Sequence, residues 1–279
     1  LMKSYVGLIL GFGILGGVGM GLAYAATTPA AVKWFGPHQR GFIVGLVVGG
    51  YGGAAIYISP LAEYLIGQYG ISGSFIGLGI FFAVVVIIAG QLLSWPDAAY
   101  VPPLSPVAHA SSSSGITRVD WSAKAMIGTV QFYALVFLFL GAAQSGLLVI
   151  GNATPILKST ASEVAFLAAN AWILSSYGGL INAVGRVGTG MYSDRMGRAN
   201  AYLVNGVVAA VCLLAMPWII ESRNVVLLFL AVGIAYWQYG GGLALLPAFT
   251  ADFFGSKNLG FNYGLVFFGW GLAFRAPHP

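Results

Sequence analysis

The sequence has 279 residues, of which 58% are hydrophobic and only 7% are charged, whereas about a quarter of the residues in soluble proteins carry a charge. With a mean hydropathy of +0.87, this composition excludes a soluble globular protein. The formal charge of +5 comes from 12 Lys and Arg residues scattered between apolar segments, so no basic patch indicates a nucleic-acid partner. The single cysteine, Cys212, and three histidines without ligand spacing give no metal site, and we expect no cofactor.

Eight apolar segments approach the length of about 20 residues that a helix needs to cross a bilayer. The sequence therefore predicts an all-α, polytopic membrane protein embedded in lipid. The first segment already includes the start of the chain and the last is incomplete, so we expect a fragment. In chain order, the segments are 4–28, 41–62, 73–95, 127–151, 163–187, 200–220, 225–248 and 258–274.

A polar stretch rich in Pro, Ser and Ala separates the third segment from the fourth. Such a composition does not order on its own, so we interpret residues 96–126 as a linker between two halves, residues 1–95 and 127–279. Seven Lys and Arg residues lie in loops on the side of this linker and four on the opposite side. Because cytoplasmic loops carry the excess of basic residues, this predicts a cytoplasmic linker.

Two distant segments repeat one pattern. Residues 33–54 read KWFGPHQRGFIVGLVVGGYGGA and residues 252–273 read DFFGSKNLGFNYGLVFFGWGLA, with ten of 22 positions identical and no gap. Internal repeats in a membrane protein indicate two halves built on one plan, with a substrate site where they meet. Since the second copy comes six segments after the first, we expect six helices in each complete half.

The loop predicted after the fifth segment reads GMYSDRMGR, from Gly190 to Arg198. Gly190 and Gly197 would permit a tight turn, and Arg195 and Arg198 would hold it at the cytoplasmic face. Asp194 can meet a helix N-terminus or a basic side chain of a neighbouring helix. A simpler interpretation is a basic turn that only anchors the topology.

This motif matches the G-x-x-x-D-[RK]-x-G-[RK] loop of the major facilitator superfamily, which the chain resembles. In that superfamily the motif lies between helices two and three and again between eight and nine. The resemblance therefore implies that the segments are helices four to eleven, about eight of twelve. Further short patterns are similar to the oxalate:formate antiporter family, with the monocarboxylate transporters next. They are Tyr24 to Phe35 with Arg40-Gly41, Ser145 to Leu147 near Gly151-Asn152, Asn182 to Gly190, and Asn258 to Leu265.

Arg186 is the strongest candidate for a substrate-binding residue. It lies eight residues before Asp194, roughly 12 Å along the helix, at a depth where a charge costs on the order of 3 kcal/mol. We therefore expect it to face the interior, where a guanidinium suits bidentate binding of a carboxylate. Asn182 lies one turn earlier on the same face. The families resembled place an arginine here against the substrate carboxylate; alternatively, Arg186 caps helix-end carbonyls or pairs with Asp194.

Four aromatic residues are candidates for the walls of this site: Tyr24, Tyr51, Trp237 and Trp270. Tyr51 and Trp270 occupy equivalent positions in the repeat, so each half would supply one aromatic wall. Each of the four could instead pack between helices or face lipid, as aromatics commonly do in membranes. The oxalate type of transporter is described with a lysine on helix eleven, and segment 258–274 has none, which favours a monocarboxylate.

These observations predict secondary active transport of a small carboxylate anion by alternating access, a monocarboxylate rather than oxalate. A proton or a counter-anion would be coupled to it, and the full-length protein would be a monomer in the plasma or inner membrane. The alternative is a transporter-like sensor or a non-transporting carboxylate-binding protein. An enzyme is not expected, because the sequence has no Ser/His/Asp set, no HExxH and no paired buried carboxylates.

Overall fold

The computed structural model describes residues 4–97, 99–102, 117, 119–161 and 164–273, and within these ranges its regular elements are helices. This confirms the predicted all-α class. The elements are α1 (Tyr5–Leu8), η1 (Ile9–Gly16), α2 (Gly17–Trp34), η2 (Pro37–Gln39), α3 (Arg40–Leu92), α4 (Ala123–Ile127), α5 (Val130–Gly151), α6 (Ala153–Thr160), α7 (Ala165–Ala169), α8 (Trp172–Met196), α9 (Arg198–Glu221), α10 (Val225–Phe254) and α11 (Leu259–Ala273).

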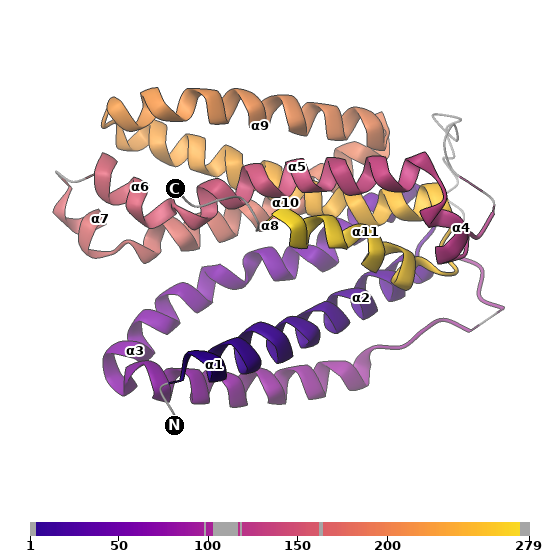
Figure 1. Ribbon diagram of the computed structural model, residues 1–279, viewed down its shortest axis with the longest axis horizontal. Coiled ribbons are helices and arrows are strands. Elements are labelled where there is room, and N and C mark those ends of the chain that lie inside the picture. The colour runs from indigo at the N-terminus through magenta and orange to yellow at the C-terminus, as the bar shows by residue number, and fades with distance from the viewer. Residues whose placement is uncertain (1–3, 98, 103–116, 118, 162–163, 274–279) are drawn as a thin grey trace.

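The run labelled α3 contains two predicted segments. Gly70, between them, has a φ of 67°, a left-handed conformation that glycine adopts without a steric penalty. The chain reverses there, so residues 71–92 run back beside the first helix of the chain, forming the lower part of Figure 1. An edge-to-face contact between Phe12 and Phe75, with ring centroids 6.2 Å apart, joins these two helices.

The fifth predicted segment, 163–187, is wrong in its boundaries. Residues 165–169 form the short helix α7, and the long helix α8 runs from Trp172 to Met196. Within the described part of the chain, five runs are long and apolar enough to cross a membrane, and α8 is not one of them. Its polar residues, among them Arg186 and Thr189, are buried inside the bundle, so an apolar window could not locate its end.

The helices form two groups that pack against each other. In Figure 1 the helices before the linker, indigo to purple, lie below α5, α8, α9 and α10, and α11 lies between the two groups. The main contacts across the boundary join α3 to α8 and α10, and α2 to α11. Many large apolar side chains point outward, as in Leu22, Phe137 and Leu214, which fits a multi-pass membrane protein whose solvent is lipid.

The linker is only partly described; residues 98, 103–116 and 118 lie outside the described residues, as do Lys3 and Arg275 of the charge count. Its last residues dock on the turn between α10 and α11. The Thr117 amide donates to the Asp252 carbonyl over 2.8 Å and the Trp121 amide to the Phe254 carbonyl over 2.9 Å. Asp120 accepts from the Lys257 amide over 3.0 Å. We call this end of the bundle the linker side.

Candidate functional site

Arg186 lies near the middle of α8, about 15 Å from the helix end at Met196 at about 1.5 Å per residue. Its side chain is buried, with the residue 5% exposed. The Nε–H donates to Asn182 Oδ1 over 2.8 Å, as expected for residues one turn apart on one face. Nη1 donates over 2.7 Å to the carbonyl of Val48 in α3. The guanidinium therefore bridges the two groups of helices near the middle of α8.

Two glycines on the neighbouring helices make room for this pair. A Cβ atom at Gly52 of α3 would lie 2.6 Å from Asn182 Oδ1, and one at Gly240 of α10 would lie 2.7 Å from the same atom. Both distances are far below van der Waals contact. The Asn182–Arg186 pair is therefore enclosed between α3 and α10, and neither helix tolerates a larger residue at these points.

Replacing Gly240 by Ala should displace the Asn182–Arg186 pair, because the new methyl group would overlap Asn182 Oδ1. We expect the purified protein to lose about 1–3 kcal/mol of stability, the usual cost of forcing extra atoms into a packed interior, measured as a lower free energy of unfolding. Gly264→Ala is the matched control, because a Cβ there meets no atom within 4 Å. Equal stabilities of the two variants would contradict the placement of the pair.

An aromatic cluster adjoins Arg186 and connects the two groups of helices. The Tyr24 ring of α2 lies 4.7 Å from that of Tyr51 in α3 and 5.3 Å from that of Phe267 in α11. Phe267 stacks on Trp270 at 5.6 Å, whose Nε1–H donates to the Tyr239 hydroxyl over 3.0 Å. The Arg186 charge interacts electrostatically with Tyr24, Tyr239 and Tyr263. Three of the four predicted aromatics therefore belong to one cluster, and Tyr239, Tyr263 and Phe267 were missed.

Trp237, the fourth predicted aromatic, is a residue of α10 that packs against α8. It packs so closely on Gly185 and Gly188 that a Cβ at either position would lie 2.7 Å from one of its atoms. Together with Tyr177 and Ile181 of α8, Trp237 lines a shallow, mostly apolar pocket. The structure thus gives Trp237 a packing role that closes α8 against α10 and does not bring it into the aromatic cluster.

Four charged residues whose side chains are 9–10% exposed meet on the linker side, and we call them the four-charge cluster: Arg40, Asp194, Arg198 and Asp252. Asp194 accepts from the amides of Gly41 and Phe42 at the start of α3, over 2.9 and 2.8 Å. It also pairs with Arg198 over 2.6 Å. Asp252 at the end of α10 pairs with Arg40 over 2.6 Å and with Arg198 over 3.1 Å. Asp194 thus meets both a helix N-terminus and a basic side chain, and it does not pair with Arg186.

The motif from Gly190 to Arg198 is not a loop over most of its length, which corrects the sequence interpretation. Residues up to Met196 continue α8, and only Gly197 turns the chain, with a φ of 87°. Gly190 serves a different purpose, because a Cβ there would overlap the backbone of Gly41. It lets α8 and α3 touch backbone to backbone. Arg195 is exposed, so of the two arginines only Arg198 joins the four-charge cluster.

The comparison with known families settles the fold. A family model described as Major Facilitator Superfamily matches residues 1–274. The chain belongs to this superfamily. The sequence expectation of a superfamily member is therefore confirmed.

Three relatives illustrate the range within the superfamily. The chain is 29% identical over 265 residues to the uncharacterized MFS-type transporter YhjX of Escherichia coli K12, covering 95% of this chain and 62% of that protein. It is 27% identical over 250 residues to the oxalate:formate antiporter of Oxalobacter formigenes, with 90% and 56% covered. Monocarboxylate transporter 12 of Rattus norvegicus is 25% identical over 283 residues, with 94% and 57% covered. The chain thus spans 56–62% of the length of these relatives.

Arg40 and Asp252 are the members of the four-charge cluster that sequence reasoning did not assign to a site. From the sequence, Arg40 is a basic loop residue within a stretch that resembles the family, and Asp252 is the first residue of the second repeat copy. Both stand at the edge of an apolar segment, on the side of the GMYSDRMGR motif. That shared edge was the available signal, but pairing residues 212 positions apart in sequence required the three-dimensional structure.

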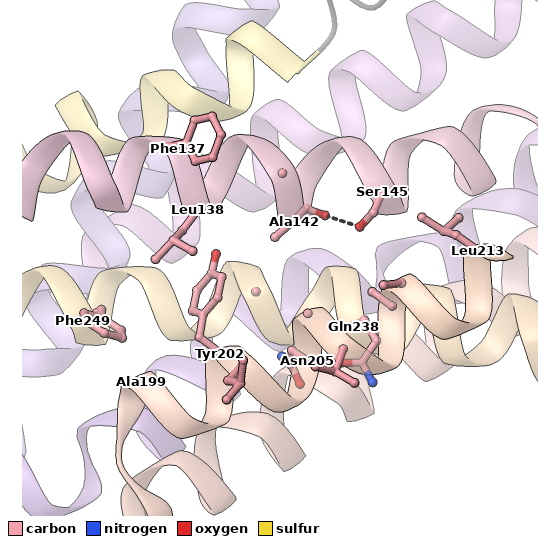
Figure 2. A pocket seen from close by; sticks show the side chains of 17 residues that line it. Phe137, Leu138, Ala142, Ser145, Ala199, Tyr202, Asn205, Leu213, Gln238 and Phe249 are labelled. Carbon is pink, nitrogen blue, oxygen red and sulfur yellow. Dashed lines mark hydrogen bonds between the residues drawn. The ribbon is translucent and has the colours of Figure 1, made fainter.

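A separate cavity of about 700 Å³ lies between α5, α9 and α10 of this superfamily member. Figure 2 shows Tyr202 projecting from α9 towards Leu138 of α5, with Asn205 and Gln238 nearby. None of its lining residues is charged. The cavity therefore offers a carboxylate hydrogen-bonding groups, among them Tyr202, Asn205 and Gln238, but no counter-charge.

Proposed function

We propose that the protein is a secondary active transporter of a small carboxylate anion. The observation that carries the proposal is Arg186: a guanidinium buried near the middle of α8, between the helices before and after the linker. Substrate sites of transporters built from two halves lie at this level, where the halves meet. Arg186 and Asn182 would bind the carboxylate, with Tyr24, Tyr51 and Trp270 forming the aromatic wall and Tyr239 and Tyr263 offering hydroxyl groups.

Alternating access would then work by separating the two groups of helices on one side at a time. On the linker side, the four-charge cluster ties α3 to α8, α9 and α10, and we propose that it holds this side closed. The loops of this side carry the excess of basic residues. This supports a linker on the cytoplasmic side of the plasma or inner membrane. We propose residues 1–95 and 127–279 as the parts that move, with residues 96–126 between them.

A monocarboxylate is the proposed substrate class, in preference to oxalate. Arg186 supplies one positive charge, and α11 from Leu259 to Ala273 contains neither Lys nor Arg. A dicarboxylate would therefore bring its second negative charge into an apolar, aromatic environment without a partner, which is costly. Among the relatives, one is an oxalate:formate antiporter and one a monocarboxylate transporter by name, so both substrate types are reasonable probes.

Counterflow in proteoliposomes tests this function. The complete protein would be reconstituted in vesicles preloaded with unlabelled formate, lactate, pyruvate or oxalate, and entry of the same radiolabelled anion followed. We expect counterflow with at least one monocarboxylate and much less with oxalate. If the anions bind, as measured by thermal stabilisation of the purified protein, but no counterflow occurs, the alternative of a sensor or a non-transporting binding protein is correct.

Replacing Trp270 by Lys should raise oxalate counterflow about tenfold, the equivalent of about 1.4 kcal/mol of added attraction. The new ammonium would stand beside Tyr239, which Trp270 now contacts and which interacts with Arg186, so a second carboxylate would find a counter-charge. Trp270→Gln is the uncharged polar control and should not improve oxalate counterflow. An equal gain in both variants would show that loss of the ring, and not the charge, is responsible.

A further inference from the structure

The last residues of the linker dock on the end of α10. We call the described ones the strap: Thr117, Val119, Asp120 and Trp121. The last carbonyl groups of a helix have no partner within the helix. The strap supplies two of the missing donors, because the Thr117 amide donates to the Asp252 carbonyl and the Trp121 amide to the Phe254 carbonyl. The final turn of α10 is therefore held by residues from outside the helix.

The turn after α10 is shaped to receive the strap. Gly255 has a φ of 82°, and a Cβ atom there would overlap Asp120 Oδ1 and lie 2.9 Å from the Asp120 Cα. Both facts favour glycine at this position. Beyond the turn, the side-chain amides of Asn258 and Asn262 donate to the Trp121 carbonyl over 2.9 and 3.0 Å. The strap therefore has a fitted seat on this turn.

Asp252 connects the strap to the four-charge cluster. Its main chain accepts from the strap, whereas its side chain bonds Arg40 of α3 over 2.6 Å and Arg198 of α9 over 3.1 Å. It lies two residues before the end of α10 at Phe254, in the part of a helix that frays most readily. Each carboxylate oxygen serves a different arginine, so both ion pairs need Asp252 to stay in one place. Whatever fixes the final turn of α10 therefore also fixes these two ion pairs.

The other end of the linker binds the equivalent helix end in the first half. α2 ends at Trp34, whose carbonyl accepts from the Tyr100 hydroxyl over 3.1 Å. In the repeat, Lys33 occupies the position of Asp252. Lys33 lies over the ring of Trp95, 4.1 Å from its centroid, and forms no salt bridge with the described residues. Both ends of the linker therefore hold a helix end, but only the strap holds one that carries a member of the four-charge cluster.

We propose that the strap positions Asp252: by holding the final turn of α10, it keeps the carboxylate on Arg40 and Arg198 and so keeps the linker side closed. This inference rests on the closing role proposed above for the four-charge cluster. Asp120 and Asn262 are then positioning residues, which act through the main chain at the end of α10. A movement of the linker that lifts the strap would loosen both ion pairs and favour opening of this side.

The experiment removes one contact of the strap at a time and measures how far the linker side opens. Spin labels at Gln39 and Asn200, both exposed, would be placed in the complete protein in a Cys212→Ala background. Asp120→Ala removes the bond to the turn after α10. We expect the ratio of long to short distances to rise about fivefold, the equivalent of about 1 kcal/mol, which is the usual net contribution of one hydrogen bond. Asn262→Leu, which removes a buried donor to the strap, should raise the ratio in the same way.

Tyr100→Phe is the matched control. It removes the hydrogen bond that the other end of the linker makes to α2, where no member of the four-charge cluster lies, so the ratio should not change. Asp97→Ala removes an exposed carboxylate from the same linker and should also leave the ratio unaltered. A rise in Tyr100→Phe equal to that in Asp120→Ala would mean that general loosening of the linker is responsible, and the proposal would be overturned.

Two variants of the four-charge cluster separate positioning of Asp252 from general support of the fold. In Asp252→Asn there is no carboxylate left to position, so adding Asp120→Ala should not raise the ratio further. In Asp194→Asn, which weakens the cluster but keeps Asp252, the same addition should raise it again. Residues that act through one another deviate from additivity in this way, whereas independent residues do not. An equal rise in both backgrounds would exclude the positioning role.

Failure of the strap and failure of the cluster give different results. If Asp252→Asn itself leaves the distances unaltered, the cluster does not close the linker side, and the strap proposal falls with it. If Asp252→Asn lengthens the distances but Asp120→Ala and Asn262→Leu do not, the strap does not position Asp252 and the closing role stands. Transport of a carboxylate is tested separately, by counterflow. Should Asn262→Leu fail to insert, Asp120→Ala decides alone, because Asp120 is exposed and its loss leaves the interior unchanged.

Discussion

Replacing Arg186 by Gln or Lys in the complete protein should abolish carboxylate counterflow and leave membrane insertion intact. Hydrogen bonds to a charged group contribute roughly 1.5–3 kcal/mol each, so losing two to a bound carboxylate lowers binding by about a hundredfold or more. Lysine keeps the charge but loses the planar fork that contacts both carboxylate oxygens. Insertion should not suffer, because Gln removes a charge that is costly at mid-membrane depth.

Arg195→Gln is the matched control for this experiment. Arg195 lies on the same helix but is exposed on the linker side, so its loss should leave counterflow nearly unchanged. Both variants would be compared at equal amounts of reconstituted protein. Normal counterflow by Arg186→Gln would remove Arg186 from the substrate site.

Much of the fold could be predicted because its signals are local in sequence. Apolar segments locate membrane helices, and the repeat between residues 33–54 and 252–273 relates the helix that begins α3 to α11. The failures occurred where tertiary contacts replace apolarity. α8 extends nine residues beyond the predicted end at 187, because Ser193 and Asp194 bond to Arg198 of α9, and Asp194 also bonds to the start of α3. A hydropathy profile therefore does not show where such a helix ends.

The charged residue of the candidate site, Arg186, could be predicted from the sequence, and the aromatic residues around it less well. A single arginine inside an apolar segment stands out because burying its charge in a membrane is costly. Asn182 lies one helical turn before it, on the same face. Aromatic residues are common in membrane helices, so nothing in the sequence separated Trp237, which packs on Gly185 and Gly188, from Trp270, which reaches Tyr239. Which face of α10 points towards Arg186 depends on how the helices pack.

Replacing Asp252 by Asn should open the linker side of the protein. Asp252 bonds Arg40 of α3 and Arg198 of α9 with both carboxylate oxygens, and neutralising it leaves two largely enclosed arginines with one aspartate. Removing one partner of a buried ion pair typically costs about 3–5 kcal/mol, which the protein avoids by separating α3 from α10. Spin labels at Gln39 and Asn200, both exposed, would report the change as longer distances, in a Cys212→Ala background.

A double variant separates charge balance from the loss of one bond. In Arg40→Gln with Asp252→Asn, the Asp194–Arg198 pair remains and the cluster is neutral again. We therefore expect shorter distances than in Asp252→Asn alone, since coupled residues do not act additively. Asp97→Asn makes the same change at an exposed carboxylate and should leave the distances unaltered. If Asp252→Asn also leaves them unaltered, the four-charge cluster does not hold the linker side closed, and Asp194 with the amides at the start of α3 must suffice.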